Sequence, residues 1–286
     1  MRKNTFFNNR TTLNCNGRLL NLSTPKVMGI LNITPDSFFD GGKYNSIDES
    51  LRRCEQLLID GADLIDIGAY SSRPGAADVS EQEEIERLRP ILKAIQQQFP
   101  QAILSIDTFR AEVARVSVLE GAAIINDISG GELDNNMFAT AANLQVPYIL
   151  MHMRGTPDTM QKLTKYDDLV SDIIKYFAEK VNRLRMLGLH DIILDPGFGF
   201  AKTLEQNYQL MAHLSELKFF DLPILSGISR KSMIYKLLEV DASHALNGTS
   251  VLNMVSLQNG ANILRVHDVK EAVEVRKIFL QLNESY

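Results

Sequence analysis

The chain has 286 residues, 45% of them hydrophobic, which is enough to bury the core of one α/β barrel or of two smaller domains. A formal net charge of -5 argues against a nucleic-acid partner, and no stretch approaches the roughly 18 consecutive apolar residues of a membrane span. Two cysteines, Cys15 and Cys54, provide neither a disulfide framework nor a Cys/His zinc pattern, so we expect an unexported protein of the reducing cytoplasm that acts on small molecules.

Residues 1–24 are polar and rich in Asn and Thr, so we expect an N-terminal extension that is irregular or a short hairpin. From Lys26 onward, short apolar runs recur that hardly alternate with polar residues. Such runs are typical of strands buried on both faces of a parallel sheet. The predicted strands span residues 26–32, 63–69, 103–107, 123–129, 146–153, 192–197, 223–229 and 262–268.

Helical patterns separate these runs. Ser46 and Glu49 have the spacing of a capping box at the start of a helix that Gly61 is placed to end. Ser80 and Glu83 repeat the start signal for the next helix. The region between the first strands therefore follows the β-then-α alternation of parallel sheets.

Three further features concern the helices. Pro90 lies inside the second helical pattern and predicts a kink or two shorter helices, because proline removes an intrahelical hydrogen bond. Residues 165–188 are expected to form the longest helix, and the helix of the fourth unit is expected to be short.

Eight strand–helix units predict a single-domain (β/α)8 TIM barrel over residues 25–286. The alternative is an open doubly wound sheet, which no GxGxxG sequence supports.

Polar side chains follow the predicted strands, where a barrel places its catalytic groups. Any one of them could be a turn residue or a helix cap, but all eight strand ends carry such groups. Two basic clusters, residues 229–232 and 265–267, end neighbouring strands and together could hold a phosphate. The strand ends supply Asn32, Ser71 to Arg73, Asp107, Asn126 and Asp127, His152, Asp195, Ser229 to Lys231, Arg265 and His267.

Three loops that contain glycine are longer than ordinary barrel connections. They are residues 32–42, 69–80 and 195–203, and each follows a predicted strand. Long loops at this end of a barrel are commonly lids or binding loops. We expect the first two to move and all three to contact a ligand.

The sequences GILNITPDSFFDGG, SSRPGA, SIDTFRAEVA, INDISGG, LMHMRGTPDTMQ, DPGFGF, SRKSM and RVHDV occur in this order. On these residues the chain resembles the bacterial dihydropteroate synthase family from about Lys26 to the C-terminus. The resemblance implies a transferase of folate biosynthesis. Its reaction joins (7,8-dihydropterin-6-yl)methyl diphosphate to 4-aminobenzoate and releases diphosphate.

The resemblance also implies roles for the polar strand ends at the pterin. An aminopyrimidinone edge needs a carboxylate to accept its N–H groups and an amide beside it. Asp195 is assigned to that edge, Asn126 lies beside it, and Asp107 faces the far ring. Lys231 is expected to donate to the carbonyl and a ring nitrogen. Arg265 is suited to stack on the heterocycle and to reach phosphate.

Loss of diphosphate leaves a delocalised cation, so charge stabilisation is the main expected catalytic task. Asn32, Arg265 and His267 are expected to hold the diphosphate. Mg²⁺ is the expected cofactor, with Asn32 as its protein ligand and Asp36 close by. No general base is required in the first step, because the arylamine lone pair can attack the cation directly.

The first two loops are implied to close over the aminobenzoate. Tyr70 stands where the family usually has glutamate, and Ser72 where it has threonine; Met151 and His152 are interpreted as packing, and Asp66 as structural. The family further implies a homodimer and a target of sulfonamides. The residues expected around the aminobenzoate are Asp36, Phe38, Ser72, Arg73, Pro74, Phe200 and Ser232.

Two alternatives stay open. A pterin-binding methyltransferase domain would share the barrel and the pterin carboxylates but would not need a diphosphate clamp. A non-catalytic folate-binding paralogue would not need Asn32, Lys231, Arg265 and His267 together, and this chain retains all four.

Overall fold

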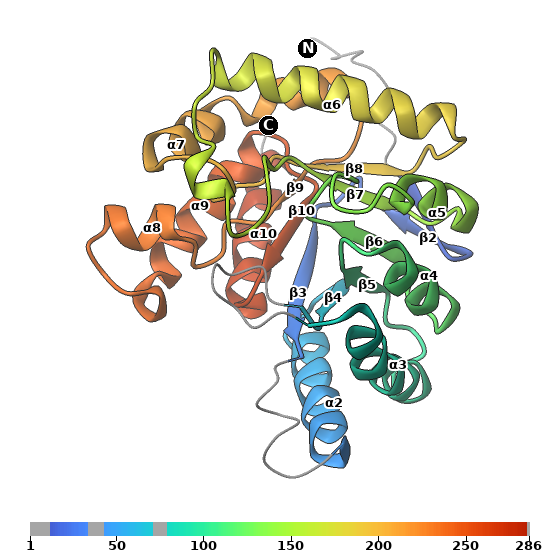
Figure 1. Cartoon of the computed structure of the whole chain (residues 1–286). Coiled ribbons are helices and arrows are strands. Elements are labelled where there is room, and N and C mark those ends of the chain that lie inside the picture. The colour runs from blue at the N-terminus through green and yellow to red at the C-terminus, as the bar shows by residue number, and fades with distance from the viewer. Residues whose placement is uncertain (1–11, 34–42, 71–78, 285–286) are drawn as a thin grey trace.

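The computed structural model describes residues 12–33, 43–70 and 79–284. Its main sheet has eight parallel strands in the order β8-β7-β6-β5-β4-β3-β10-β9. A parallel bridge between Leu194 and Ile224 joins the two outer strands, so the sheet curves round into the predicted barrel (Figure 1). The strands are β3 (Lys26–Asn32), β4 (Leu64–Gly68), β5 (Leu104–Asp107), β6 (Ile124–Asp127), β7 (Tyr148–Met151), β8 (Ile192–Asp195), β9 (Leu225–Ser226) and β10 (Ile263–Val266).

Helices surround the sheet and cover its outer face (Figure 1). Among the described residues, no helix is both long enough and apolar enough to cross a membrane. The helices are α2 (Lys43–Ile59), α3 (Glu81–Gln98), α4 (Ala111–Leu119), α5 (Met137–Leu144), α6 (Leu169–Met186), α7 (Leu204–Ala212), α8 (Ser232–Leu237), α9 (Leu246–Gln258) and α10 (Val269–Glu284). Short 3-10 helices occupy Met160–Lys162, Leu214–Phe220 and Ala242–His244.

The inward face of the barrel changes from apolar to polar along the strands. Residues two apart on a strand share a face, so each inward position can be followed toward the carboxyl end. The apolar layer includes Met28, Leu64, Ile124, Ile193 and Ile263, and the next inward positions include Asp66, Asn126, Asp195 and Arg265. The carboxyl ends of the strands therefore enclose a polar floor supported by a packed apolar layer.

The N-terminal extension contains a hairpin of β1 (Thr12–Cys15) and β2 (Arg18–Asn21). Its turn residues Asn16 and Gly17 have φ angles of 52° and 84°, which is typical of the two-residue Asn-Gly turn. Leu13 and Leu20 pack in the same cluster as the apolar inward layer. The hairpin thus covers the end of the barrel opposite the polar floor, which leaves the carboxyl ends of the strands for the site.

The helix boundaries differ from the predictions in two places. Helix α2 begins at Lys43, three residues before the predicted capping box of Ser46 and Glu49. Helix α6 begins at Leu169 instead of residue 165, since the Asp168 side chain accepts from the Ser171 backbone N–H at 2.7 Å and caps it there. Its 18 residues equal the length of α3.

Helix α3 confirms its predicted start, where Ser80 Oγ accepts from the Glu83 backbone N–H at 3.2 Å. It continues through Pro90 as one helix, so the expectation of two shorter helices is wrong. Leu88 and Ile91 on either side of the proline are buried, and this packing offsets the lost backbone hydrogen bond. The short helix expected in the fourth unit is α5, with 8 residues.

Candidate active site

The structure brings together part of the predicted site. Asp36, Phe38, Ser72, Arg73 and Pro74 lie outside the described residues. The remaining predicted residues end β3, β5, β6, β8 and β10 or follow β8 and β9, and all belong to the carboxyl-end side of the barrel. They are Asn32, Asp107, Asn126, Asp195, Phe200, Lys231, Ser232, Arg265 and His267.

Arg265 connects the polar side chains of four strands. Its Nε donates to Asp66 Oδ2 at 2.6 Å, and its Nη2 donates to Asp107 Oδ2 at 2.6 Å. Asp66 Oδ2 also accepts from Asn126 Nδ2 at 2.9 Å. The Asn126 amide thus donates to Asp66, and the guanidinium is held in place between two carboxylates.

Asp66 has a larger part in this site than the sequence indicated. It is fully buried and contacts both Asn126 and Arg265, two residues assigned to the pterin. Its place two residues after the inward-facing Leu64 was the signal in the sequence that could have found it. The side chain positions its neighbours, so its role is structural within the site itself.

Burial sets the protonation of the acids and the lysine. It raises the pKa of Asp107 to about 7, against the opposing charge of Arg265. Burial also raises the pKa of Asp195, which Lys231 opposes. It lowers the pKa of Lys231 to about 8, which the charge of Asp195 opposes. The floor therefore holds groups that change charge near neutral pH.

The protonation of Asp107 makes the stability of the protein depend on pH. Its pKa rises from 3.8 to about 7 on folding, so the folded state binds this proton more tightly and gains stability as pH falls through about 7 toward 4. Asp107→Asn cannot titrate. We expect the free energy of unfolding of the wild type, minus that of the variant, to rise as pH falls from about 8 to about 5 in denaturant titrations. A flat difference would contradict the assignment.

The loop after β8 arranges Asp195 and Lys231. Asp195 Oδ1 accepts from the Gly197 backbone N–H at 2.8 Å, and Lys231 Nζ donates to the Phe198 carbonyl. Lys231 Nζ also lies 4.6 Å from the centroid of the Phe200 ring. Since Asp195 Oδ1 is occupied by the loop, Oδ2 is the oxygen available to a ligand.

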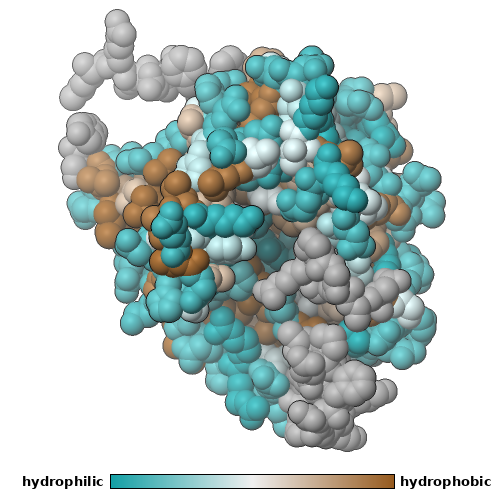
Figure 2. Space-filling model, turned by 60° about the vertical axis from the view of Figure 1, so that its left-hand side comes forward, coloured by the Kyte–Doolittle hydropathy of each residue, from teal (hydrophilic) through white to brown (hydrophobic). Residues whose placement is uncertain are grey.

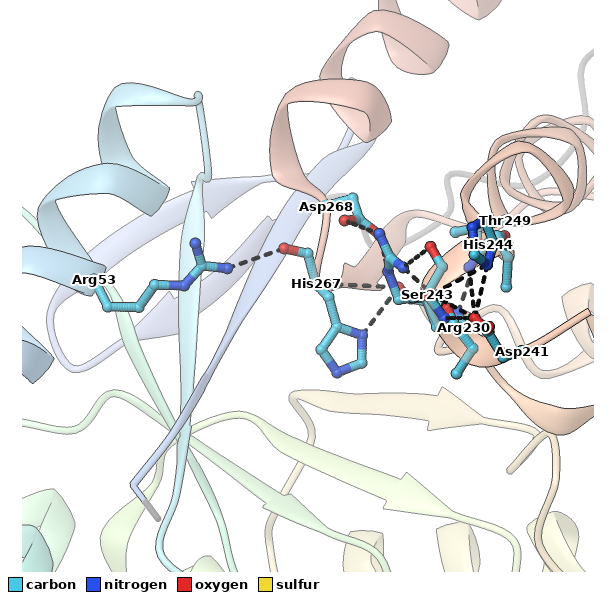
Figure 3. Close-up of polar contacts among 11 residues, drawn as sticks. Arg53, Arg230, Asp241, Ser243, His244, Thr249, His267 and Asp268 are labelled. Carbon is cyan, nitrogen blue, oxygen red and sulfur yellow. Dashed lines mark hydrogen bonds and ion pairs between the residues drawn. The ribbon is translucent and has the colours of Figure 1, made fainter. Parts of the chain in front are cut away.

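The two basic clusters meet at the ends of β9 and β10. Ser229 Oγ lies 3.1 Å from His267 Nδ1 and accepts from the His267 backbone N–H at 3.2 Å. Arg53 of α2 donates to the His267 carbonyl at 3.2 Å (Figure 3). The prediction that these strand ends adjoin is thus supported by a direct contact.

Arg230 has a different task from its neighbours. Its Nε and Nη2 donate to the two carboxylate oxygens of Asp268, each at 2.8 Å, and its Nη1 donates to the Ala242 and Ser243 carbonyls (Figure 3). The Arg230 guanidinium therefore links Asp268, after β10, to the short helix Ala242–His244. Within residues 229–232, Lys231 is the side chain that contacts the loop after β8, and Ser232 is the first residue of α8.

Asp127, a buried carboxylate next to Asn126, stabilises the loop after β6. Asp127 accepts from the backbone N–H groups of Ser129 and Gly131, each at 2.7 Å, and from the Tyr148 hydroxyl. It belongs to the strand end that carries Asn126, but its partners are all in the loop and the outer layer. The strand-end pattern alone could not separate this structural acid from the ligand-facing ones.

The fold and the geometry define a barrel of the enzyme type, with a charged polar network at the carboxyl ends of its strands, where barrel enzymes bind their substrates. Residues 28–267 match the family described as pterin binding enzyme. The dihydropteroate synthase of Escherichia coli is 46% identical over 264 residues, which cover 92% of this chain and 93% of the relative. The chain belongs to the pterin binding enzyme family and, within it, to the dihydropteroate synthases.

Solved structures agree. The dihydropteroate synthase of Yersinia pestis, in a complex with a sulfonamide drug, superposes with a TM-score of 0.89 at 45% identity and covers 96% of this chain and 100% of its own. That of Xanthomonas albilineans, in complex with 7,8-dihydropteroate, gives a TM-score of 0.85 at 35% identity, with 95% and 98% covered. The predicted barrel, family and transferase activity in folate synthesis are confirmed, and the two alternative functions are set aside.

Proposed function

We propose that the polar floor binds the pterin of the dihydropteroate synthase substrate and that the ends of β3 and β10 bind its diphosphate. The observation that supports this most directly is the network of Arg265 with Asp66, Asp107 and Asn126. It presents a planar cation, an amide oxygen and an acid toward one space. Buried polar groups of this kind are costly unless a ligand or a neighbour pairs with them.

The pterin is recognised by hydrogen bonds at its two edges. Asp195 Oδ2 accepts from the amino group and the ring N–H, while Asn126 lies beside it. Lys231 donates to the carbonyl and a ring nitrogen, and Asp107 faces the far ring. Because the pKa of Asp107 is about 7 and that of Lys231 is about 8, each group can gain or lose a proton when the ligand binds.

The chemical step breaks the bond between the methylene carbon and the diphosphate oxygen, whose electron pair leaves with the diphosphate. The cation that remains is delocalised over the dihydropterin. Arg265 and His267 stabilise the departing charge, and the lone pair of the arylamine forms the new C–N bond. The amine proton is lost to solvent afterwards, so no side chain is assigned as a general base.

Magnesium fits this arrangement as an ion held mainly by the substrate. Among the described residues, no group of three or more His, Cys, Asp or Glu could hold a metal by itself. Asn32 is exposed at the end of β3 and offers one amide oxygen, and Mg²⁺ keeps waters and phosphate oxygens as its other ligands. Asn32 would hold the ion. When bound, it would neutralise diphosphate charge.

The 4-aminobenzoate is proposed to lie between Phe200, the start of α8 at Ser232 and the first two loops. Ser232 is the first residue of α8 and is partly buried. The structures of relatives are solved with 4-aminobenzoic acid and with a sulfonamide drug, so a sulfonamide is expected to compete for this place.

The reaction is tested with the purified protein, the pterin diphosphate, 4-aminobenzoate and Mg²⁺. The expected products are 7,8-dihydropteroate and diphosphate, and chelation of the metal should lower the rate without preventing binding of 4-aminobenzoate. Absence of product with a folded protein would overturn the proposal. Mass spectrometry of the product distinguishes it from hydrolysis of the diphosphate alone.

The protein is further proposed to act in the cytoplasm as a homodimer. Its two cysteines, Cys15 and Cys54, are both free and buried.

Large exposed apolar side chains occur on α8 and α9, at Leu237 and Val251. The view that brings this side of the molecule forward contains a hydrophobic patch (Figure 2). Sedimentation velocity should give twice the chain mass of 32.1 kDa, and a monomer at micromolar concentration would contradict this.

A further inference from the structure

A second lysine lies behind the site, in the loop that follows β8. Lys202 is 4% exposed, and its Nζ donates to the Gly197 carbonyl at 2.9 Å and to the Phe200 carbonyl at 3.0 Å. The same atom lies 3.0 Å from His152 Nδ1 at the end of β7. None of the roles above uses this lysine or this histidine.

The three partners match the donors of one ammonium group. A protonated lysine has three N–H donors and no acceptor, and two carbonyl oxygens and one imidazole nitrogen are three acceptors. Burial lowers the pKa of His152 well below its ordinary value, which leaves the ring neutral. A neutral imidazole that accepts at Nδ1 carries its proton on Nε2. Burial also lowers the pKa of Lys202 well below its ordinary value, which the charge of Asp195 opposes. The three acceptors around Nζ match the protonated form of Lys202 beside a neutral His152.

The histidine is fixed by its surroundings. It is 1% exposed, and its ring meets the Tyr176 ring edge-on with centroids 4.8 Å apart. The Tyr166 and Phe177 rings lie at 6.1 Å and 6.5 Å. Because the imidazole has no room to turn, Nδ1 stays directed at the lysine.

The segment that Lys202 holds is the one that arranges the floor. Phe198 lies between Gly197 and Phe200, the two residues whose carbonyls Lys202 contacts, and its own carbonyl accepts from Lys231. The Phe200 ring also lies next to the Lys231 ammonium group. The Gly197 backbone N–H donates to Asp195. A disturbance of these carbonyls would therefore reach both the carboxylate and the cation assigned to the pterin.

The backbone of this segment requires such support. Gly197 and Gly199 have φ angles of 68° and 81°, and Ala201 has 49°, a value that is unfavourable for a residue with a side chain. At Gly197 an added Cβ would lie 2.1 Å from the His152 carbonyl oxygen, so the loop presses directly on β7. A tightly turned loop of this kind needs internal hydrogen bonds to keep one shape.

We infer that Lys202, held by His152, is a positioning residue that fixes residues 197–200 so that Asp195, Lys231 and Phe200 face the substrates together. The inference rests on the proposed function, since it concerns the same floor. It assigns a role to two buried residues that touch neither substrate.

The chain offers a matched control in Lys180 of α6. Lys180 is 3% exposed, pairs with Glu132, and lies 5.7 Å and 5.4 Å from the Phe138 and Tyr176 ring centroids. Like Lys202 it is a buried lysine, but none of these partners belongs to residues 197–200. Lys202→Met and Lys180→Met both exchange a buried cation for an apolar chain of similar length.

The experiment measures stability by denaturant unfolding and binding of the pterin diphosphate by calorimetry without 4-aminobenzoate. We expect Lys202→Met to weaken pterin binding about tenfold and to raise the KM for 4-aminobenzoate, as loss of hydrogen bonds to a charged group would do. Lys180→Met should leave both within about twofold, whatever stability it loses. Equal pterin affinity in Lys202→Met and the wild type, or equal losses in both variants, would overturn the inference.

A second variant covers the case in which Lys202→Met does not fold. His152→Phe keeps a ring among the neighbouring aromatic residues but removes the acceptor, and should weaken pterin binding about threefold. Unchanged affinity in this folded variant would also overturn the inference. If the wild type itself neither binds nor turns over the pterin diphosphate, the proposed function fails instead, so the two failures can be told apart.

Discussion

Asp195→Asn is expected to raise the dissociation constant of the pterin diphosphate about 100-fold. The substitution keeps the shape of the side chain but replaces an oxygen that accepts two N–H groups by an amide. Charge-assisted hydrogen bonds contribute about 1.5 to 3 kcal/mol each, so the loss of two corresponds to a factor of about 100 or more. Isothermal calorimetry with the wild type and the variant measures it.

Asp127→Asn provides the control for this prediction. Asp127 is another fully buried carboxylate that accepts from backbone N–H groups, but its partners lie in the loop of Ser129 and Gly131. The variant should lose stability and keep its pterin affinity within about twofold. If Asp195→Asn bound the pterin as the wild type does, the assignment of the recognition edge would be wrong.

Arg265→Met is expected to lower kcat/KM by about 1000-fold or more and the free energy of unfolding by about 3 to 5 kcal/mol at pH 7. The guanidinium is the partner of Asp66 and Asp107, so its removal leaves two carboxylates facing each other in the barrel. It also removes the cation assigned to the departing diphosphate. Steady-state kinetics and denaturant titrations report the two losses separately.

The pH dependence of this variant distinguishes the electrostatic cause from lost packing. Without the guanidinium, the pKa of Asp107 should rise above its wild-type value of about 7, because burial and the charge of Asp66 are no longer opposed. The stability deficit of the variant should therefore shrink as pH falls toward about 7, where the unpaired Asp107 of the variant takes up its proton before that of the wild type, and it should stay constant at lower pH. A deficit that stays constant between about pH 9 and 7 would favour packing as the cause.

Arg110→Met is the matched control for Arg265→Met. Arg110 pairs with Glu84, which is fully buried in α3, so this variant also leaves a buried carboxylate without its cation. Its loss of stability should be comparable, but its affinity for the pterin should change little. Equal losses of pterin affinity in the two variants would show that unfolding, and not a missing site cation, explains the effect.

Much of the fold could be read from the residues in order. The continuous apolar runs identify the strands because both faces of a parallel barrel sheet are buried. Ser80 fixes the start of α3 through a contact three residues away, which is local and therefore visible in sequence. The strand-end rule placed Asp107, Asn126, Asp195 and Arg265 at one mouth without any knowledge of their contacts.

Local patterns failed where packing outweighed them. Pro90 does not divide α3, because the buried stripe of that helix outweighs one missing hydrogen bond. At Pro90 a short-range preference is thus outweighed by burial against residues far along the chain. The N-terminal extension, by contrast, contains the short hairpin that was one of its two expected forms, with its turn at Asn16 and Gly17.

Local periodicity and one topological rule were enough to predict the strands, most of the helices and the polar groups that surround the mouth. Which group pairs with which is visible only in the folded chain. Arg265 reaches Asp66 across 199 positions, Arg230 is taken up by Asp268, and Lys202 is held by His152. Such pairings depend on closure of the barrel and on loop geometry, because charge and hydrogen-bonding capacity alone allow many partners within one ring of strand ends.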